Sequence, residues 1–180
     1  MIYIETPRLL LRSWKEEDIE PFAEMNGDHR VMEFFLNRLT REESRSFYER
    51  INREFTEYGY GLYAVECKSD HSFIGYTGFH RIPFEVDFAP GVEIGWRLKY
   101  ECWNRGYASE AAKACLEYAA AHLPFSTVWS FTSLPNRRSE KVMRKIGMEW
   151  VKEFLHPSVP DGHPLKTHLL YKRVFHPAGD

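Results

Sequence analysis

The segment from Glu93 to Ala121, EIGWRLKYECWNRGYASEAAKACLEYAAA, constrains the fold of this chain more than any other part of its sequence. An apolar run typical of a buried strand leads into a short basic turn with one glycine, Gly106, and then into a long amphipathic stretch typical of a helix. This order brings backbone N–H groups and the positive end of a helix to one place. The sequence therefore predicts an anion-binding turn, with an ordinary strand–turn–helix connection as the alternative.

Two residues of the basic turn suit a phosphate-bearing ligand. Gly106 lacks a Cβ atom, so the backbone there can approach a ligand closely. Arg105 precedes it and carries a planar guanidinium group, whose donors match the oxygens of a phosphate. We therefore expect this turn to bind phosphate groups.

Strand and helix patterns follow one another along the whole chain, without a repeat, a low-complexity stretch or a linker. The sequence predicts strands at residues 2–14 (broken or bulged near Pro7), 61–67, 72–80, 92–98, 127–133, 148–156 and 166–175. It predicts helices at residues 16–25, where Ser13 is the candidate cap, at 106–122 and at 136–146. Another helix should begin at the capping box of residues 40–43. This order favours a mixed central sheet flanked by helices.

Size and charge narrow the choice of protein class. A chain of 180 residues with 43% hydrophobic residues can build one domain, residues 1–180, around one core. Its formal net charge of −2 gives no general attraction to nucleic acid or to an anionic membrane. A cluster of cations at residues 137–145 would fit a nucleic-acid-binding domain, but the acidic total charge argues against that class. We therefore expect no nucleic-acid partner and no membrane partner.

The cysteines and the N-terminal segment indicate a cytoplasmic protein. Cys67, Cys102 and Cys115 are odd in number and lack C-x-x-C spacing, so we expect reduced thiols that act as small hydrophobic residues. The first 14 residues lack the basic flank and the long apolar core of a signal peptide. No apolar run is long enough to span a bilayer.

Several segments, taken in order, resemble one enzyme family. Residues 93–121 are followed at 130–150 by SFTSLPNRRSEKVMRKIGMEW, and three more segments are ETPRLLLRSW at 5–14, GLYAVE at 61–66 and HLLYKRV at 168–174. The set resembles the GNAT superfamily of acetyl-CoA-dependent N-acetyltransferases, and most closely its branch of ribosomal-protein N-terminal acetyltransferases. The resemblance spans nearly the whole chain. It implies the α/β (mixed α+β) GNAT fold, with a mixed, mostly antiparallel sheet that is splayed at the cofactor cleft and flanked by helices.

The resemblance implies acetyl-CoA as the cosubstrate. The backbone of the strand that holds Trp96 and Leu98 would pair with the pantetheine arm, and the N–H of Leu98 would polarise the thioester carbonyl. Main-chain N–H groups of the turn would bind the pyrophosphate, and its residues are Trp103, Asn104, Arg105, Gly106, Tyr107, Ala108 and Ser109. Asn136 and Ser139 match positions that contact the cofactor arm in relatives, and helix capping is the alternative role, above all for Asn136.

Three positions depart from the family pattern. Trp103 stands where Gln or Arg is frequent, and Asn104 stands where glycine is frequent, although asparagine tolerates a positive φ. Met143 occupies the position at which many members carry a tyrosine as general acid. Ser139 is the substitute acid that we expect, and the alternative is that a thiolate with a pKa of about 8.5 leaves unaided.

Glu93 is the candidate general base. It is a carboxylate within an apolar strand run, beside the expected cofactor cleft. An α-amino group has a pKa of about 7.7–8.0, so a weak base or a water relay would suffice to deprotonate it. The alternative is a solvated or salt-bridged structural role, because glutamate is seldom buried without a partner.

The acceptor pocket is the part of the site that the sequence specifies least. Relatives build it from the first two helices, a strand-connecting loop and the last hairpin, which here supply Met32, Phe34, Phe35, Phe84, Glu85, Asp87 and Phe88. Aromatic rings with two carboxylates would suit a cationic, partly apolar amine. His168 or His156 would add a polar wall. The irregular spacing of these two histidines with His163 argues against a metal site.

Taken together, these features predict direct acetyl transfer from acetyl-CoA to a primary amine in a ternary complex, because no cysteine occupies a recognisable nucleophile position. The acceptor would be a peptide or protein N terminus, or a small-molecule amine such as a polyamine or an amino sugar. A non-catalytic acyl-CoA-binding sensor or partner-binding module is the alternative, favoured by Met143 and opposed by Glu93. The high aromatic content leaves a homodimer open.

Overall fold

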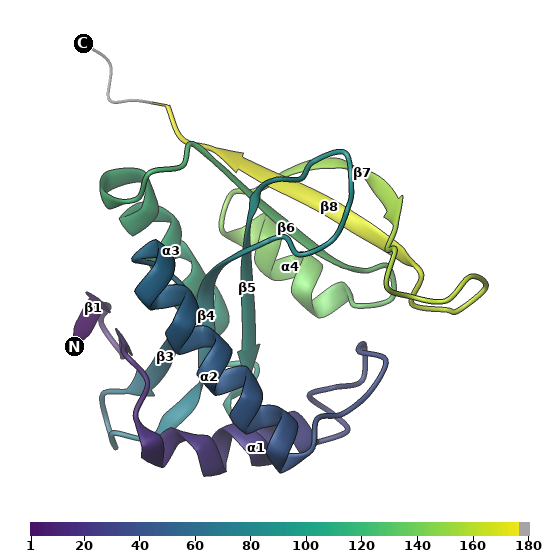
Figure 1. The fold of residues 1–180 in the computed structure, drawn as a ribbon. Helices are drawn as coiled ribbons and strands as arrows, with labels where there is room; N and C mark the ends of the chain where they lie inside the picture. The colour runs from purple at the N-terminus through teal and green to yellow at the C-terminus, as the bar shows by residue number, and fades with distance from the viewer. Residues whose placement is uncertain (177–180) are drawn as a thin grey trace.

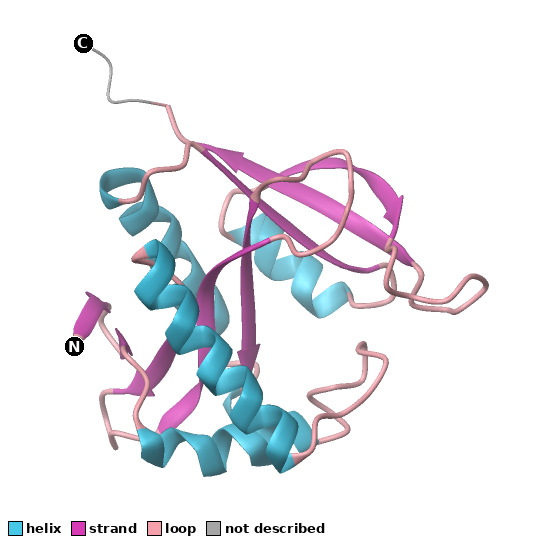
Figure 2. Ribbon diagram, in the orientation of Figure 1, coloured by secondary structure: helices cyan, strands magenta, loops and turns pink. Residues whose placement is uncertain are grey.

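Eight strands form one sheet, in the order β1-β2-β3-β4-β5-β6-β8-β7, in the computed structural model, which describes residues 1–176 (Figure 1). The strands are β1 Ile2–Glu5, β2 Leu9–Arg12, β3 Leu62–Cys67, β4 Phe73–Arg81, β5 Val92–Leu98, β6 Thr127–Ser133, β7 Glu149–Leu155 and β8 Thr167–Val174. The helices are α1 Ile19–Gly27, α2 Arg41–Tyr58, α3 Tyr107–His122 and α4 Arg137–Lys145, with short 3-10 turns η1 Glu16–Asp18 and η2 Tyr100–Cys102. Helices lie on both sides of the sheet, as predicted (Figure 2).

Strands β5 and β6 are the one parallel pair among the described strands, and the other neighbours are antiparallel. Parallel neighbours need a long crossover connection, and here that connection contains α3. β4 pairs with β5 along the whole length of β5, from Arg81 opposite Val92 to Gly75 opposite Leu98. The prediction of a mixed, mostly antiparallel sheet is confirmed.

Helix α2 begins at the predicted capping box. The Thr40 hydroxyl accepts a hydrogen bond from the Glu43 N–H at 3.1 Å, and the Glu43 carboxylate accepts one from the Thr40 N–H at 2.7 Å. The helix ends at Gly59, whose φ of 75° is left-handed and favours glycine. Ile51 of this helix is fully buried.

The N-terminal segment differs from the prediction in two details. Residues 2–14 form a hairpin of β1 and β2, because the chain reverses near Pro7, where the Thr6 N–H donates to the Leu9 carbonyl at 3.0 Å. Ser13 does not cap the following helical turn, because its hydroxyl accepts a hydrogen bond from the N-terminal amine. The Asp18 carboxylate instead accepts a hydrogen bond from the Lys15 N–H at 2.8 Å.

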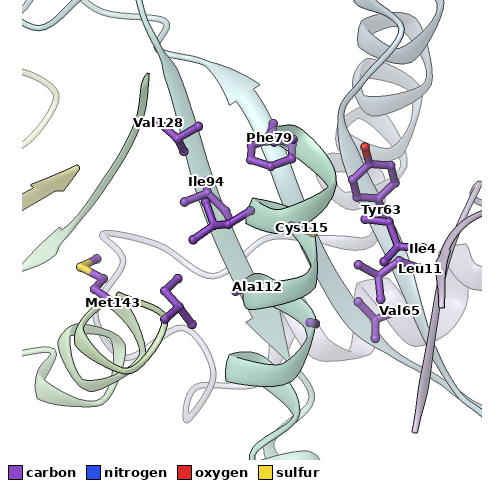
Figure 3. Packing of buried hydrophobic residues seen from close by; sticks show 14 of the residues in the cluster. Ile4, Leu11, Tyr63, Val65, Phe79, Ile94, Ala112, Cys115, Val128 and Met143 are labelled. Carbon is purple, nitrogen blue, oxygen red and sulfur yellow. The ribbon is translucent and has the colours of Figure 1, made fainter. Parts of the chain in front are cut away.

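The sheet has an apolar core on each face, because alternate residues of a strand point to opposite sides. In β3, Tyr63 and Val65 join the core under α3, which contains Cys115, whereas Leu62 and Ala64 join the core under α1 and α2. Figure 3 shows Phe79, Ile94 and Val128 beside the helix that carries Ala112 and Cys115. The two cores fix α3 on one face of the central strands, and α1 and α2 on the other.

The three cysteines are free thiols, as predicted, and Cys67 and Cys115 are buried. None of the helices within residues 1–176 combines the length and the apolar character that a membrane span requires.

Candidate active site

Strands β5 and β6 separate shortly after they meet. Glu93 and Trp129 are their one pair in register, and the Ser130 hydroxyl donates to the Ile94 carbonyl at 3.0 Å just beyond it. Figure 1 shows the two strands diverging from this end, so that the remainder of β5 has β4 as its neighbour on one edge only. The sheet is therefore open along the edge of residues 95–98.

The backbone of this open edge presents N–H groups to the gap. The Lys99 N–H donates to the Ile74 carbonyl next to β4 at 2.9 Å. Because successive N–H groups of a strand point to opposite edges, those of Leu98 and Trp96 point toward the gap. The Trp103 indole N–H donates to the Leu98 carbonyl at 3.0 Å, on the same edge. The turn that follows β5 is thereby held against the gap.

The gap opens into a cleft of about 1480 Å³ that runs between the two halves of the sheet. Its lining includes the residues predicted for catalysis and cofactor binding, apart from Arg105, and part of the expected acceptor pocket: Glu93, Trp96, Leu98, Trp103, Asn104, Gly106, Tyr107, Ala108, Ser109, Asn136, Ser139, Phe34, Phe35, Phe84 and His168. Residues far apart in the sequence thus meet in one continuous site.

The turn before α3 has the geometry of an anion-binding site. Gly106 has a φ of 79° and Asn104 a φ of 59°, so both adopt the left-handed conformation that glycine and asparagine tolerate. Among the described residues no side chain caps α3, and its first intrahelical bond runs from the Glu110 N–H to the Gly106 carbonyl. The N–H groups of residues 107–109 therefore have no acceptor within the helix.

Arg105, which the sequence predicts at the phosphate site, is not among the described residues that line the cleft. The residue is exposed, and its carbonyl accepts a hydrogen bond from Arg8 at 2.9 Å. Three cations of α4 line the cleft instead: Arg138, Lys141 and Lys145. The Arg138 guanidinium lies over the Trp103 ring at 4.2 Å, whereas Arg137 and Arg144 pair with Glu140 on another side of the helix.

Asn136 and Ser139 combine capping with a place in the cleft. Asn136 caps α4, because its side-chain oxygen accepts a hydrogen bond from the Ser139 N–H at 3.2 Å. Its amide group also donates to the Ser139 hydroxyl at 3.2 Å, which fixes that hydroxyl in the lining of the cleft. Met143 is buried and lines the cleft one turn further along α4.

Glu93 is salt-bridged and also lines the cleft. His80 Nε2 lies 2.8 Å from Glu93 Oε2, and 12% of the Glu93 side chain is exposed. Burial lowers the pKa of His80, but the charge and the hydrogen bond of Glu93 outweigh it, so that pKa lies above its ordinary value. Sequence reasoning missed His80, which became recognisable only once the β4–β5 register placed it opposite Glu93.

Two histidines, His156 and His168, lie side by side in the lining of the cleft. The rings of His156 and His168 lie 4.7 Å apart, and Phe84 lies 4.4 Å from His156. Burial lowers the pKa of His168 to about 4, assisted by the neighbouring His156, and burial also lowers the pKa of His156. Within residues 1–176, no three His, Cys, Asp or Glu side chains are grouped closely enough to hold a metal ion.

The acidic loop that follows β4 does not supply carboxylates to the cleft. Asp87 forms an ion pair with Lys152, and Glu85 is absent from the cleft lining, although Phe84 is present. Phe88 is buried against Trp129. The two carboxylates expected beside a cationic acceptor are therefore not among the described residues that line the cleft, and the loop that carries them packs against Phe131 of β6 and Phe154 of β7.

Comparison with known proteins agrees with this geometry. A family model described as an acetyltransferase (GNAT) domain matches residues 8–149. The Bacillus subtilis (strain 168) protein named uncharacterized N-acetyltransferase YnaD is 29% identical over 163 residues, which cover 90% of this chain and 91% of that protein.

Two solved structures share the whole fold. The acetyltransferase (GNAT family) from Bacillus anthracis has a TM-score of 0.79 at 27% identity, over 97% of this chain and 98% of that one. RimL, described as a ribosomal L7/L12 α-N-protein acetyltransferase in complex with coenzyme A, has a TM-score of 0.80 at 16% identity, over 98% and 99%. At that identity the likeness to RimL shows the fold alone. Because the matched domain covers most of its length, the chain belongs to the GNAT family of acetyltransferases.

Proposed function

We propose that this enzyme transfers the acetyl group of acetyl-CoA directly to the primary amine of a protein or peptide N terminus. One observation carries the proposal: the open edge of β5 and the uncapped start of α3 line the same cleft. An extended amide-bearing chain can pair with the first feature, and a pyrophosphate can bind the second.

The cofactor contacts follow from these two features. The pantetheine amides would pair with the backbone of Trp96 and Leu98, and the N–H groups of residues 107–109 would donate to the pyrophosphate. The cations on the cleft side of α4, Arg138, Lys141 and Lys145, would neutralise the remaining phosphate. These cations would take the role that the sequence assigned to Arg105.

In the transfer step, the amine nitrogen would attack the thioester carbon, and the carbon–sulfur bond would then break. The N–H of Leu98 would stabilise the oxyanion, because it points into the gap. The Ser139 hydroxyl, positioned by Asn136, would donate to the leaving sulfur. The buried Met143 cannot do so, because it carries no proton to give.

Glu93 would accept the proton of the amine through water. Leu98 lies five residue steps along the extended strand from Glu93, or roughly 16 Å at about 3.3 Å per step. A glutamate side chain does not span that distance, so a direct contact with an amine at Leu98 is excluded. A water relay suffices because an α-amino group is only weakly basic.

A protein N terminus is the acceptor that best fits what is known of the similar solved structures. The solved structure of RimL carries a name that specifies α-N-protein acetylation, and its fold matches nearly all of this chain. Small-molecule amines remain the competing acceptors within the same reaction. A non-catalytic acyl-CoA sensor is the competing function, favoured by Met143 in the lining of the cleft.

Thiol release from acetyl-CoA tests the proposal across a panel of N-terminal peptides, free amino acids, polyamines and aminoglycosides. We expect release that depends on the peptide and yields peptide acetylated at its α-amine. Release with polyamines or aminoglycosides alone would change the acceptor class. Tight binding of acetyl-CoA without release for any amine would support the sensor instead.

A further inference from the structure

Arg97 lies on the face of β5 that Glu93 and Gly95 share. Side chains alternate along a strand, so residues 93, 95 and 97 face α1 and α2, whereas Ile94 and Leu98 enter the core under α3. Arg97 contacts Asn26 of α1 and lines the cleft. It therefore belongs to the acceptor side of the site and not to the cofactor turn.

The guanidinium of Arg97 is held in a fixed orientation. It donates from Nη1 to the Asn26 side-chain oxygen at 2.9 Å, and the buried Asn26 in turn donates to the Ser44 hydroxyl at 3.1 Å. The Arg97 guanidinium lies 4.5 Å from the Phe35 ring centroid and 5.4 Å from that of Tyr76. Such stacking and hydrogen bonding pre-organise the planar group for an incoming anion.

This cation has no carboxylate partner in the structure. Other arginines pair with carboxylates within 4 Å, among them Arg12, Arg30 and Arg144, but among residues 1–176 none lies that close to Arg97. Its Nε is buried and has no hydrogen-bond partner in the part of the chain that the structure describes. An unpaired, partly buried guanidinium in a cleft favours a ligand that brings its own negative charge.

The face of β5 between the two charged residues is open. A Cβ built on Gly95 would meet nothing closer than Glu93 Oε1 at 4.0 Å. Glu93 and Glu54 lie at one end of this face, and both act electrostatically on His80. Arg97 lies two residues beyond Gly95, about 7 Å along the strand. An acceptor over Gly95 would meet negative charge on one side and positive charge on the other.

We infer that Arg97 selects acceptors that carry a carboxylate a few bonds from the reacting amine. The inference rests on the proposed acetylation of an amine and specifies which amines are preferred. The carboxylate could be an acidic side chain at the first or second residue of a peptide, or the α-carboxylate of a free amino acid. Both sources present the same chemistry, a primary amine with a nearby carboxylate, to the same guanidinium.

The experiment compares matched acceptors by thiol release. Peptides that begin Ser-Asp and Ser-Asn, both amidated at the C terminus, test the side-chain carboxylate. Free amino acids and their amides test the α-carboxylate. Each acceptor is measured with the wild-type enzyme, with Arg97→Gln and Arg97→Lys, and with Arg50→Gln as the matched control. Arg50 also lines the cleft, but it is exposed and stacks on Phe47 of its own helix.

We expect the kcat/KM of the wild-type enzyme to be about tenfold or more higher for one of the carboxylate-bearing acceptors than for its matched amide. A charged hydrogen bond has an effect of this size. Arg97→Gln should abolish this preference by raising KM for that acceptor, while its matched amide is unaffected. Arg97→Lys should keep part of the preference, and Arg50→Gln should keep all of it.

Equal rates for carboxylate and amide acceptors in the wild-type enzyme would overturn the inference but not the acetyltransferase activity. An equal loss for all acceptors in Arg97→Gln would also overturn it, because Arg97 would then only support the fold. Thermal unfolding and acetyl-CoA binding of each variant separate that case from misfolding. Absence of acetylation for every amine would instead refute the proposed function itself.

Discussion

His80 and Glu93 face one another across the β4–β5 ladder, with the imidazole Nε2 2.8 Å from the carboxylate Oε2. They are a register pair in which one partner is the candidate base and the other a histidine whose pKa is raised. The carboxylate is therefore oriented by a neighbouring strand rather than by a loop, and its position is as rigid as the sheet.

Replacing His80 with Gln should destabilise the protein more at low pH than at high pH. The folded-state pKa of His80 lies above its unfolded value of about 6.5. Its stabilising effect is thus complete below that value and is lost as the pH rises through the folded-state pKa. We expect a loss of about 1 kcal/mol near pH 6 and almost none near pH 9. Chemical denaturation at both pH values measures it, and an equal loss at both would contradict the pairing.

Replacing Glu93 with Gln should lower turnover while sparing the cofactor. A positioned general base contributes about a hundredfold or more to the rate. We expect a fall of that size in kcat, greatest at low pH where the amine is mostly protonated, with an unchanged dissociation constant for acetyl-CoA. Glu42→Gln is the control, because Glu42 also lines the cleft but is exposed in the first turn of α2. An unaltered pH–rate profile in the Glu93 variant would remove this residue from the mechanism.

Replacing Ser139 with Ala should lower kcat by about tenfold if its hydroxyl assists the leaving sulfur. The backbone N–H of residue 139 can still donate to the Asn136 side-chain oxygen, so α4 should keep its N-terminal cap. Pre-steady-state measurement of thiol release gives the chemical step directly. A wild-type rate in this variant would mean that the thiolate leaves unaided.

Replacing Gly106 with Ala should weaken acetyl-CoA binding. The left-handed φ of 79° costs a residue with a Cβ about 1–2 kcal/mol, and the new Cβ would lie 3.4 Å from Arg8 Nη2. Gly59→Ala is a matched control, because Gly59 has a φ of 75° with open space around it and lies outside the cleft lining. Calorimetry should show reduced affinity for the Gly106 variant alone, although both variants lose stability. If the Gly106 and Gly59 variants bind acetyl-CoA with similar affinity, the turn at Gly106 does not contribute to cofactor binding.

Replacing Glu66 with Gln should destabilise the fold without involving the cleft. Arg12 binds both Asp18 and Glu66, and the three side chains are at most 8% exposed. Removing one charge of such a group costs about 3 kcal/mol. Glu5→Gln, at an exposed pair with Lys68, should cost less than about 1 kcal/mol. Urea unfolding at neutral pH compares the two, and similar losses would refute the importance of burial.

The contribution of Glu66 to stability should depend on pH in the opposite direction to that of His80. Burial raises the pKa of Glu66, but hydrogen bonds from Arg12 and His71 outweigh it, so the folded-state pKa lies below the ordinary value. Its contribution is present above about pH 4.3 and is lost as the pH falls through the lower folded-state pKa. The Glu66→Gln variant should therefore lose less stability than the wild type on acidification.

Local sequence signals predicted the local parts of the site well. The capping box at Thr40 and the glycine turn at Gly106 depend on neighbouring residues, so their patterns are visible in the sequence. Non-local relationships were not visible. The pairing of His80 with Glu93 depends on strand register, and the pairing of Asp87 with Lys152 depends on how a loop crosses β7. The exposed position of Arg105 was not visible either, because it depends on the backbone path of the turn, where the Arg105 carbonyl accepts a hydrogen bond from Arg8.

Because β5 and β6 share a single register pair, the sheet consists of two half-sheets, β1–β5 and β6–β8–β7. In the described residues, helix packing joins them, with Ile94 and Met143 in a common core. A pantetheine arm paired with β5 would act as a ninth strand that the protein does not encode. The cosubstrate would then be a structural part of the sheet, adding about 2.7 kcal/mol of stability at a hundredfold excess over its dissociation constant. The two half-sheets would move more independently each time coenzyme A leaves.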